Sequence, residues 1–351
     1  MLKQTRVFFV FFSLLIILSL FWGCDDNPLA PENETDKDYI AYTYEGINHQ
    51  YFEYHPLTGI IDSFTCEDGP TWKLEASADG KYLFVATSDY VAKVDIKTKE
   101  TVETLPNRAK NGIAISPDNK LIAFLMGPGI VIVRLSDFSV IYEDSLIDLR
   151  SGSFSYDSKR LFGRDNSLYN AIIIMDIDDN FSTTTKELPV GPIKVIKPSL
   201  DETKYFLIWQ YDMWSNIYSV YDIILDSIIF KEQIWGGLVD LLTSPNGKYV
   251  FYTEAGDYSD IPGSNYFTIY DIAKNRIKMK ISTLGIEDGI NPTYMALGAM
   301  CITPDSKWLI INQARNYPAF IRFNLNTMEI DDYFKYGQSG SIGGFTCQLI
   351  E

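Results

Sequence analysis

One short stretch of the chain carries three carboxylates within seven residues. The stretch "EAGDYSD" places Glu254, Asp257 and Asp260 on a single segment between two apolar runs. Carboxylate oxygens are the ligands that calcium prefers, so these three residues are candidate metal ligands. Their spacing differs from that of an EF-hand loop, and acidic loops are commonly just solvated. We therefore expect no cofactor, with Ca²⁺ at these residues as the alternative.

Aromatic residues with polar tips lie beside carboxylates in this segment and in others that lack apolar periodicity. Exposed Tyr and Trp rings suit sugars or peptide segments, and carboxylates suit hydroxyls or cations. The candidate binding residues are Trp214, Tyr169, Tyr258, Tyr294, Tyr317, Asp212, Asp257, Asp260 and Asp288. The alternative is that these rings cap the core, because the chain has 23 Tyr and 21 Phe residues throughout.

Residues for catalysis are scarce. The chain has two histidines, His49 and His55, so no third imidazole is available for a histidine-rich metal site. The sequence contains no Gly-x-Ser-x-Gly elbow, no P-loop and no dinucleotide-binding glycine pattern. We therefore predict no catalytic residue.

A phrase of ten residues recurs along the chain and indicates how these side chains are positioned. It reads "SADGKYLFVA" from Ser77, "SPDNKLIAFL" from Ser116 and "SPNGKYVFYT" from Ser244, with variants elsewhere. The aligned acidic or Asn positions are Asp79, Asp118, Asp157, Asp201, Asn246 and Asp305. Their spacings are 39, 39, 44, 45 and 59 residues, and a period of 40 to 50 residues with strands in each unit is typical of a β-propeller.

Each repeat divides into four strands by alternation and turn residues. In the first whole repeat these are "TWKLEAS", "YLFVAT", "VAKVDI" and "ETVETLP", and the turn between the first two contains Asp79 and Gly80. Asp79 is placed to accept backbone N–H bonds, and Gly80 tolerates positive φ. Asn119 and Ser158 replace that glycine in later repeats, and His55 takes the place of the Asp in "VDI", where we expect a turn role.

The two ends of the chain complete one another. Residues 38–66 contain a second, third and fourth strand without a first, and "GGFTCQLIE" from Gly343 is a first strand with nothing after it. Joining them closes a ring and removes the free radial edge. The prediction is an all-β, seven-bladed propeller with four-stranded blades over residues 38–351, about 45 residues per blade.

The repeats resemble the YVTN and WD40-like propeller repeats of exported bacterial proteins. The matching stretches are "SPDNK", "SPNGKYVFY" and "SADGKYLFVATSDYVAKVDIKTKETVETLP". The resemblance implies the fold, while proteins that share it include lactone hydrolases, lyases, dehydrogenase subunits and pure binding proteins. In such a ring, the second-to-third loops and the blade-to-blade connections lie on one face, and most of the candidate binding residues are in these loops.

The N-terminus reads as an export signal with a lipid anchor. Lys3 and Arg6 precede the apolar run "VFFVFFSLLIILSLFW", which is shorter than a committed membrane span. The "GC" at Gly23 and Cys24 resembles the lipobox of bacterial lipoproteins, which implies lipidation of Cys24. We predict a signal peptide over residues 1–23, a polar tether over residues 24–37, and a location in the bacterial cell envelope facing the periplasm or exterior.

The net charge limits the class of binding partner, and the number of cysteines limits the disulfide bonds that the protein can form. The formal charge is −16, and −18 without Lys3 and Arg6, so nucleic-acid binding is not expected. Cys66, Cys301 and Cys347 cannot all pair with one another, which excludes a disulfide framework. Cys301 and Cys347 hold equivalent places in neighbouring first strands, where small size explains them and a disulfide between them is the alternative.

Two functions remain open from the sequence. The first is a membrane-anchored, non-catalytic propeller that binds a protein or glycan partner on its loop-rich face. The second is a propeller hydrolase or lyase of the lactonase type that uses acidic residues and a divalent metal. Three or more carboxylates converging on the channel mouth would favour the enzyme, and a broad aromatic surface would favour binding.

Overall fold

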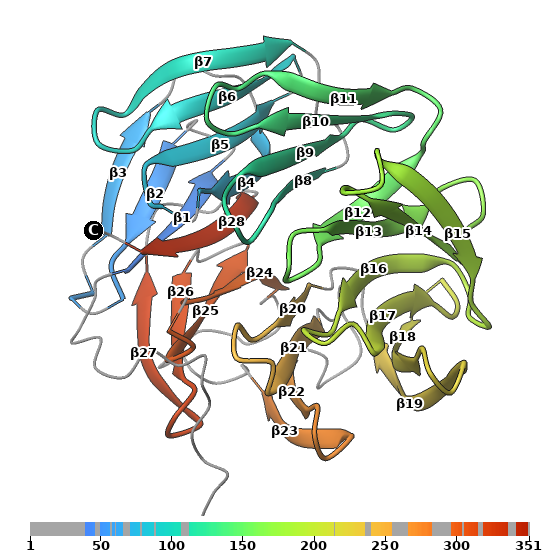
Figure 1. Ribbon diagram of the computed structural model, residues 1–351. Coiled ribbons are helices and arrows are strands. Elements are labelled where there is room, and N and C mark those ends of the chain that lie inside the picture. The colour runs from blue at the N-terminus through green and yellow to red at the C-terminus, as the bar shows by residue number, and fades with distance from the viewer. Residues whose placement is uncertain are drawn as a thin grey trace, which may run out of the picture. The chain divides into compact units, whose positions relative to one another are not determined.

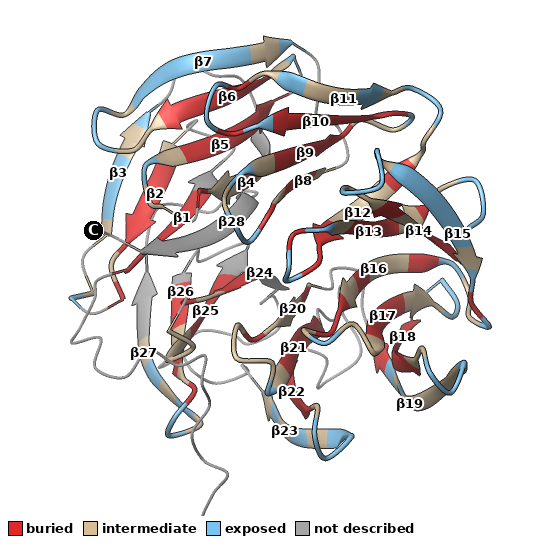
Figure 2. Ribbon diagram, viewed as in Figure 1, coloured by how far each residue is buried: buried red, intermediate tan, exposed pale blue. Residues whose placement is uncertain are grey.

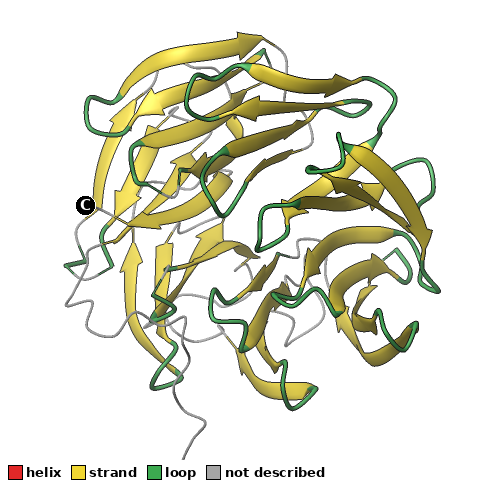
Figure 3. Ribbon diagram, viewed as in Figure 1, coloured by secondary structure: helices red, strands yellow, loops and turns green. Residues whose placement is uncertain are grey.

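The structure is a computed structural model in which all regular elements of the described residues are β-strands (Figure 3). It describes residues 39–45, 50–56, 58–59, 61–65, 71–77, 79–87, 89–106, 112–213, 215–235, 240–254, 266–282, 296–303, 305–314, 319–335 and 342–349. No helix long and apolar enough to cross a bilayer occurs among them. The expected signal peptide, Cys24 and the tether lie outside these residues.

The strands form seven antiparallel sheets of four strands, which we call blades 1 to 7. Blades 1 to 4 consist of β28 (Ile342–Leu349), β1 (Tyr39–Glu45), β2 (Gln50–Tyr54) and β3 (Ile61–Thr65); β4 (Thr71–Ala76), β5 (Tyr82–Thr87), β6 (Tyr90–Asp95) and β7 (Glu100–Pro106); β8 (Gly112–Ile115), β9 (Leu121–Leu125), β10 (Ile130–Arg134) and β11 (Val140–Asp144); and β12 (Leu149–Phe154), β13 (Arg160–Asp165), β14 (Ala171–Asp176) and β15 (Ser182–Glu187).

Blades 5 to 7 follow the same order from the first to the fourth strand. They consist of β16 (Ile193–Pro198), β17 (Lys204–Gln210), β18 (Ser215–Asp222) and β19 (Ser227–Trp235); β20 (Leu241–Thr243), β21 (Tyr249–Glu254), β22 (Tyr266–Asp271) and β23 (Arg276–Ser282); and β24 (Ala296–Ile302), β25 (Trp308–Ala314), β26 (Ala319–Asn324) and β27 (Glu329–Lys335).

The first strands of the seven blades form a closed circuit. Each contacts the next in the order β28, β4, β8, β12, β16, β20 and β24, and β24 contacts β28 again (Figure 1). This circuit confirms the predicted seven-bladed β-propeller.

Blade 1 is assembled from both ends of the chain, as the sequence predicts. Strand β28 pairs antiparallel with β1, and the register places Ala41 opposite Cys347 and Tyr39 opposite Leu349. Strand β1 is therefore hydrogen-bonded on both sides, since β2 pairs along its other edge. The paired backbone groups leave no open strand edge at the junction of the two ends.

Burial follows the position of each strand in its blade (Figure 2). The middle strands β9 and β10 are buried along nearly their whole length, whereas the outer strand β7 is almost fully exposed. Both faces of a middle strand are covered because each blade lies against its two neighbours. Phe84 of blade 2 and Phe124 of blade 3, for example, belong to one buried cluster. The core therefore lies between blades rather than within them.

The recurring phrase folds into one hydrogen-bonded turn, which joins the first and second strands. In blade 4, the Ser155 hydroxyl donates to Asp157 Oδ1 at 2.7 Å and accepts from the Arg160 backbone N–H at 2.9 Å. Asp157 Oδ1 also accepts from the Lys159 N–H at 3.1 Å. The same Ser/Thr–Asp pair recurs at Ser77, Ser116, Ser199 and Thr303. Blade 6 has Asn246 in place of the Asp, and its Oδ1 accepts from the Lys248 N–H at 3.1 Å.

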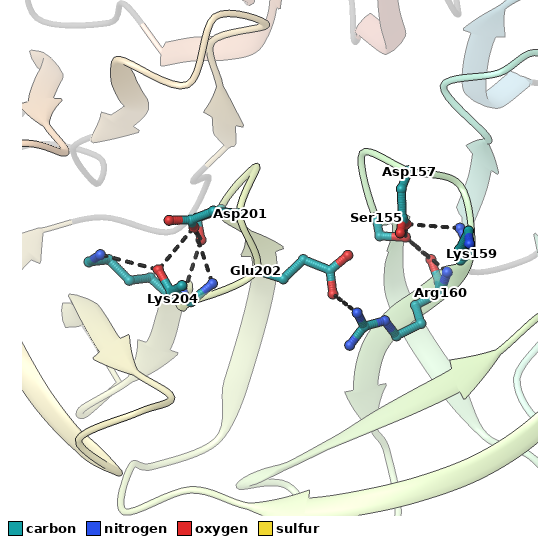
Figure 4. Close-up of polar contacts among 9 residues, drawn as sticks. Ser155, Asp157, Lys159, Arg160, Asp201, Glu202 and Lys204 are labelled. Atoms are coloured by element: carbon teal, nitrogen blue, oxygen red, sulfur yellow. Dashed lines mark hydrogen bonds and ion pairs between the residues drawn. The ribbon is translucent and has the colours of Figure 1, made fainter.

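Each of these turns contains one residue in the left-handed region. Gly80 has φ of 72°, and Asn119 and Ser158, which replace the glycine, have φ of 57° and 63°. The turns therefore accept non-glycine residues, as the sequence indicated. Neighbouring turns are also connected, because Arg160 Nη2 of blade 4 lies 2.8 Å from Glu202 Oε2 of blade 5 (Figure 4). This face of the ring is consequently regular and internally bonded.

Cys301 is disulfide-bonded. It lies on β24, and the neighbouring first strand β28 contains Cys347, whose side chain lies outside the described residues. Small size alone, which the sequence favoured for Cys301, is therefore not the whole explanation of this residue.

The turn carboxylates predict an acid-sensitive fold. Partial burial alone would raise the pKa of Asp157, but hydrogen bonds from Ser155 and the Lys159 N–H outweigh it and hold the pKa below its usual 3.8. The pKa values of Asp79, Asp118 and Asp201 are lowered in the same way. A carboxyl whose pKa is lower in the folded state stabilises the protein above its unfolded pKa, and this contribution is lost as the pH falls through the folded value.

We expect the free energy of unfolding to fall as the pH drops below about 4, measured by denaturant titration. Asp157→Asn should lower the free energy of unfolding by less than about 1 kcal/mol at neutral pH, because Asn246 makes the equivalent hydrogen bond in the turn of blade 6. The same variant should make the free energy of unfolding less dependent on pH in the acid range. The exposed Asp89→Asn is the matched control. An equal flattening by both variants would contradict the assignment.

Candidate functional site

The loops that connect second to third strands and one blade to the next lie together on one face. The Asn166 N–H donates to the Asp148 carbonyl at 3.0 Å, and the Ile193 N–H donates to the Tyr169 carbonyl at 2.7 Å. The Gln210 N–H likewise donates to the Pro192 carbonyl at 2.8 Å. These bonds link the loops over blades 4 and 5 into a continuous strip, opposite the Ser–Asp turns. We call this side the loop-rich face.

Three of the residues singled out from the sequence are described. Tyr169 is exposed on the loop-rich face. Asp212 accepts a hydrogen bond from the Ser215 N–H at 2.7 Å, so its carboxylate closes its own loop. Glu254 ends β21 and is 2% exposed. The remaining candidates lie outside the described residues; they are Trp214, Asp257, Tyr258, Asp260, Asp288, Tyr294 and Tyr317.

Glu254 is buried and forms an ion pair with the partly exposed Lys280. Lys280 Nζ lies 2.6 Å from Glu254 Oε1 and 3.5 Å from Glu232 Oε1, so one ammonium bridges two carboxylates. Among the described residues, no group of three or more His, Cys, Asp and Glu side chains is arranged to hold a metal ion. Asp257 and Asp260, the other two proposed calcium ligands, are not described, so calcium binding there stays a prediction.

Five exposed apolar side chains lie on the strip of hydrogen-bonded loops over blades 4 and 5. They are Leu146 (88% exposed), Leu168 (43%), Tyr169 (64%), Tyr211 (62%) and Met213 (80%), and we call them the apolar rim. They come from three loops that surround β12, β13 and β17. Sequence reasoning selected only Tyr169, although Leu168 precedes it directly and Met213 lies between the candidates Asp212 and Trp214. Exposed apolar side chains gathered in this way commonly mark an interaction surface.

A basic cluster lies beside the apolar rim, at the end of blades 4 and 5 nearest the loops. Arg150 of β12 stands directly opposite Arg164 of β13 in the strand register, which places both side chains on the same side of the sheet. Like charges directly opposite each other destabilise a sheet. Asp148 offsets part of this repulsion, with its Oδ1 3.6 Å from Arg150 Nε. Arg164 Nη1 donates to the Ile193 carbonyl of blade 5 at 2.7 Å.

Irregularities in the first strands help to present these cations. The register of β12 shifts between Arg150 and Ser153, and Ser151 has φ of 51°. The register of β16 shifts between Ile193 and Val195, so Lys194 is the extra residue of a bulge. Bulges leave one residue unpaired and re-aim its side chain. Lys194 thereby joins Arg150 and Arg164 in the basic cluster.

The pKa values in the basic cluster show how closely its charges lie. Burial, and then the neighbouring Arg150, lower the pKa of Arg164 below its ordinary value. Burial, and then Arg164, lower the pKa of Lys194. Desolvation and like charge both disfavour the protonated form of a base, and an anion nearby would favour it.

Further charged side chains meet along the ring axis. Lys73 Nζ on β4 lies 3.6 Å from Glu75 Oε1, and Lys197 of β16 and Asp240 before β20 interact electrostatically with both. Burial raises the pKa of Glu75 above its usual value and lowers that of Lys197. These four residues come from blades 2, 5 and 6, so they face one another only because the ring is closed. They form a balanced set of two cations and two anions.

A cavity of about 760 Å³ lies on the opposite face, between the turns of blades 2 to 4. Its carboxylates at Asp79, Asp118 and Asp157 are already bonded within their own turns. Lys93, which also lines it, lies over the Tyr82 ring at 4.2 Å and donates to the Leu135 carbonyl at 3.4 Å. The three turn carboxylates of this cavity therefore serve the turns that build it, and Lys93 is engaged by the side chain of Tyr82 and the carbonyl of Leu135.

Comparison with solved structures places the chain in the class of β-propellers. It is similar to hydrazine synthase of Kuenenia stuttgartiensis, with 16% identity, a TM-score of 0.62, and coverage of 77% of this chain and 87% of that one. It is also similar to the dihydro-heme d1 dehydrogenase NirN in complex with DHE, with 12% identity, a TM-score of 0.61, and coverage of 91% and 77%.

A third similar structure is the β-propeller domain of Myceliophteria thermophila Cps50 (Swd1). It shares 11% identity and a TM-score of 0.61 over 80% of this chain and 90% of that one. No protein-family model and no curated protein sequence matches the chain. At these identities the likeness establishes the fold and leaves the function to the site itself.

The opposed arginines predict a variant that is more stable than the natural protein. Arg150→Gln removes one of two like charges that face each other, so the free energy of unfolding should rise by about 0.5 kcal/mol at low salt. Thermal or denaturant unfolding measures this, with the exposed Arg276→Gln of blade 6 as the matched control. A clear loss of stability in Arg150→Gln relative to that control would show that Asp148 already balances the pair.

Proposed function

We propose that this protein is a non-catalytic binding propeller that docks a partner protein on its loop-rich face. The observation that carries the proposal is the apolar rim. Leu146, Tyr169 and Met213 are each more than half exposed, and they stand on three linked loops over adjacent blades. Side chains of these types gain binding energy when a partner removes them from water.

The composition of the rim favours a protein over a glycan. Leu146, Leu168 and Met213 are aliphatic, whereas sugar binding relies on aromatic faces with free polar groups beside them. Met and Tyr are enriched at protein–protein interfaces, and Met adapts its shape to a partner. The carboxylate of Asp212, which the sequence offered for hydroxyl binding, is engaged by the Ser215 N–H.

The alternative is a hydrolase or lyase of the lactonase type. That function calls for several carboxylates converging at the mouth of the channel. Among the described residues, the loop-rich end of blades 4 and 5 instead carries three cations, and its carboxylates are engaged locally: Asp148 by Arg150 and Asn166, Asp165 by Ser167, and Asp212 by the Ser215 N–H. Farther along the axis, Glu75 and Asp240 lie beside Lys73 and Lys197. This balance of charge supports binding over acid–base chemistry.

Membrane anchoring is the second part of the proposal. It is supported by the apolar run before "GC", by the polar tether after Cys24, and by the resemblance to YVTN and WD40-like repeats of exported proteins. A lipid on Cys24 would hold the propeller at the surface of the cell envelope, where a loop-rich face can meet proteins of the periplasm or exterior. The NirN complex with DHE adds that a propeller of this shape can hold a ligand.

Site-specific photocrosslinking in intact cells tests the docking surface. A photoreactive phenylalanine in place of Tyr169 or Tyr211 should form a discrete adduct with a partner protein. The same residue in place of Val102, which is 53% exposed on the outer strand β7, should form none.

A pair of aspartate variants tests whether the crosslinked adduct depends on the apolar rim. Met213→Asp should reduce the Tyr169 adduct roughly tenfold, because it places a carboxylate in an apolar contact, and Val102→Asp should leave it unchanged. Equal yields of adduct from the apolar rim and from β7, or no adduct from the apolar rim, would contradict the proposed docking surface.

The anchor predicts a lipid on the mature N-terminus. Growth with an alkyne-labelled fatty acid should label the natural protein and fail to label Cys24→Ser, which should accumulate with residues 1–23 attached. Cys301→Ser is the control and should be labelled normally. Labelling of Cys24→Ser would contradict the assignment.

A further inference from the structure

We propose that Arg150, Arg164 and Lys194 form a carboxylate-binding subsite for an acidic segment of the partner protein. The inference rests on the proposed docking function and names the chemistry of the partner. The three cations belong to adjacent blades and lie at the end of the ring that carries the apolar rim.

The two guanidinium groups retain donors for a ligand. Each guanidinium has five N–H donors in a planar fork. Arg164 uses one for the Ile193 carbonyl, which orients the group, and its Nε is buried without a hydrogen-bond partner among the described residues. Arg150 Nε is also buried and lies 3.6 Å from Asp148, whereas 34% of the Arg150 side chain is exposed, so a ligand would meet the Nη donors. Such forks match a carboxylate with two parallel hydrogen bonds.

The three cations of the basic cluster outnumber the carboxylates that form ion pairs with them. The chain carries −16 overall, yet Asp148 is the single carboxylate in an ion pair with any of the three cations among the described residues. Asp148 is itself held in place, because Asn166 Nδ2 donates to its Oδ2 at 2.8 Å. Arg164 and Lys194 therefore have no carboxylate ion-pair partner among the described residues, and the repulsion between Arg150 and Arg164 costs sheet stability.

A bound carboxylate would reverse that cost. It would screen the repulsion between Arg150 and Arg164 and accept hydrogen bonds from their remaining Nη donors. Lys194, presented by its bulge, would add a third contact. The apolar rim beside the cluster specifies a peptide rather than a simple anion, because Leu146, Leu168 and Met213 need apolar side chains to cover them.

The acidity of the rest of the protein disfavours non-specific binding of an acidic peptide. A polyanion is repelled by a surface of net charge −16, so non-specific attraction works against binding. Binding of an acidic peptide would consequently report a local basic site. The same repulsion disfavours nucleic acids, which need an extended basic track along many phosphates.

The experiment measures peptide binding to the full-length protein in detergent by fluorescence anisotropy. The probe is a fluorescein-labelled octapeptide of alternating glutamate and leucine, and its counterpart has glutamine in place of glutamate. We expect the glutamate peptide to bind roughly tenfold more tightly than the glutamine peptide, and its affinity to fall as salt rises.

Two variants localise the effect. Arg150→Gln should weaken the glutamate peptide roughly tenfold without lowering the melting temperature, and Lys194→Gln should weaken it to a smaller extent. Arg276→Gln makes the same charge change on the outer strand of blade 6 and should leave binding unaffected. A variant that binds less while remaining as stable as the natural protein separates lost recognition from lost folding.

Three results would overturn the inference. They are equal binding of the two peptides, equal losses in Arg150→Gln and Arg276→Gln, and complete displacement of the peptide by an equal concentration of inorganic phosphate, which would make the cluster a general oxyanion site. If crosslinking from Tyr169 persists while the glutamate peptide fails to bind, the docking surface stands and only the acidic partner is excluded.

Discussion

The pairing of β28 with β1 is the constraint on which the rest of the structure depends. Each blade buries its middle strands only against its two neighbours, so blade 1 needs a first strand to contact both β4 and β24. That strand comes from the opposite end of the chain. Closure therefore converts seven small sheets, none of which covers its own apolar faces, into a continuous core. Cys301, disulfide-bonded on the adjacent β24, adds a covalent bond to this part of the ring.

The two faces of the ring follow different physical rules. On one face, a buried Ser or Thr hydroxyl and an Asp or Asn two residues later satisfy the backbone of each turn, so all six whole blades look alike. Bonds such as that between Arg160 and Glu202 tie these turns together. The loops on the other face have no such shared pattern, and they are free to differ in length and chemistry. The apolar rim and the basic cluster both lie on that variable face.

The basic cluster brings like charges together at a cost in stability. Arg150 and Arg164 face each other across a strand pair, where folding alone would favour an apolar or oppositely charged residue. Lys194 interrupts the regular pairing of β16 for the same region. By contrast, Lys73, Glu75, Lys197 and Asp240 are two cations and two anions from blades 2, 5 and 6 that interact electrostatically with one another on the axis.

The sequence by itself determined the blade and the number of blades, because both depend on local pattern. The Ser77–Asp79 turn spans a few residues, strand alternation has a period of two, and the split first blade is visible as three strands at one end and one at the other. Only the tertiary structure decided the site. The exposure of Met213 and the proximity of Arg164 to Lys194 and of Lys73 to Asp240 depend on which blades are neighbours and on where a bulge redirects a side chain. A local sequence period contains no information about either of these.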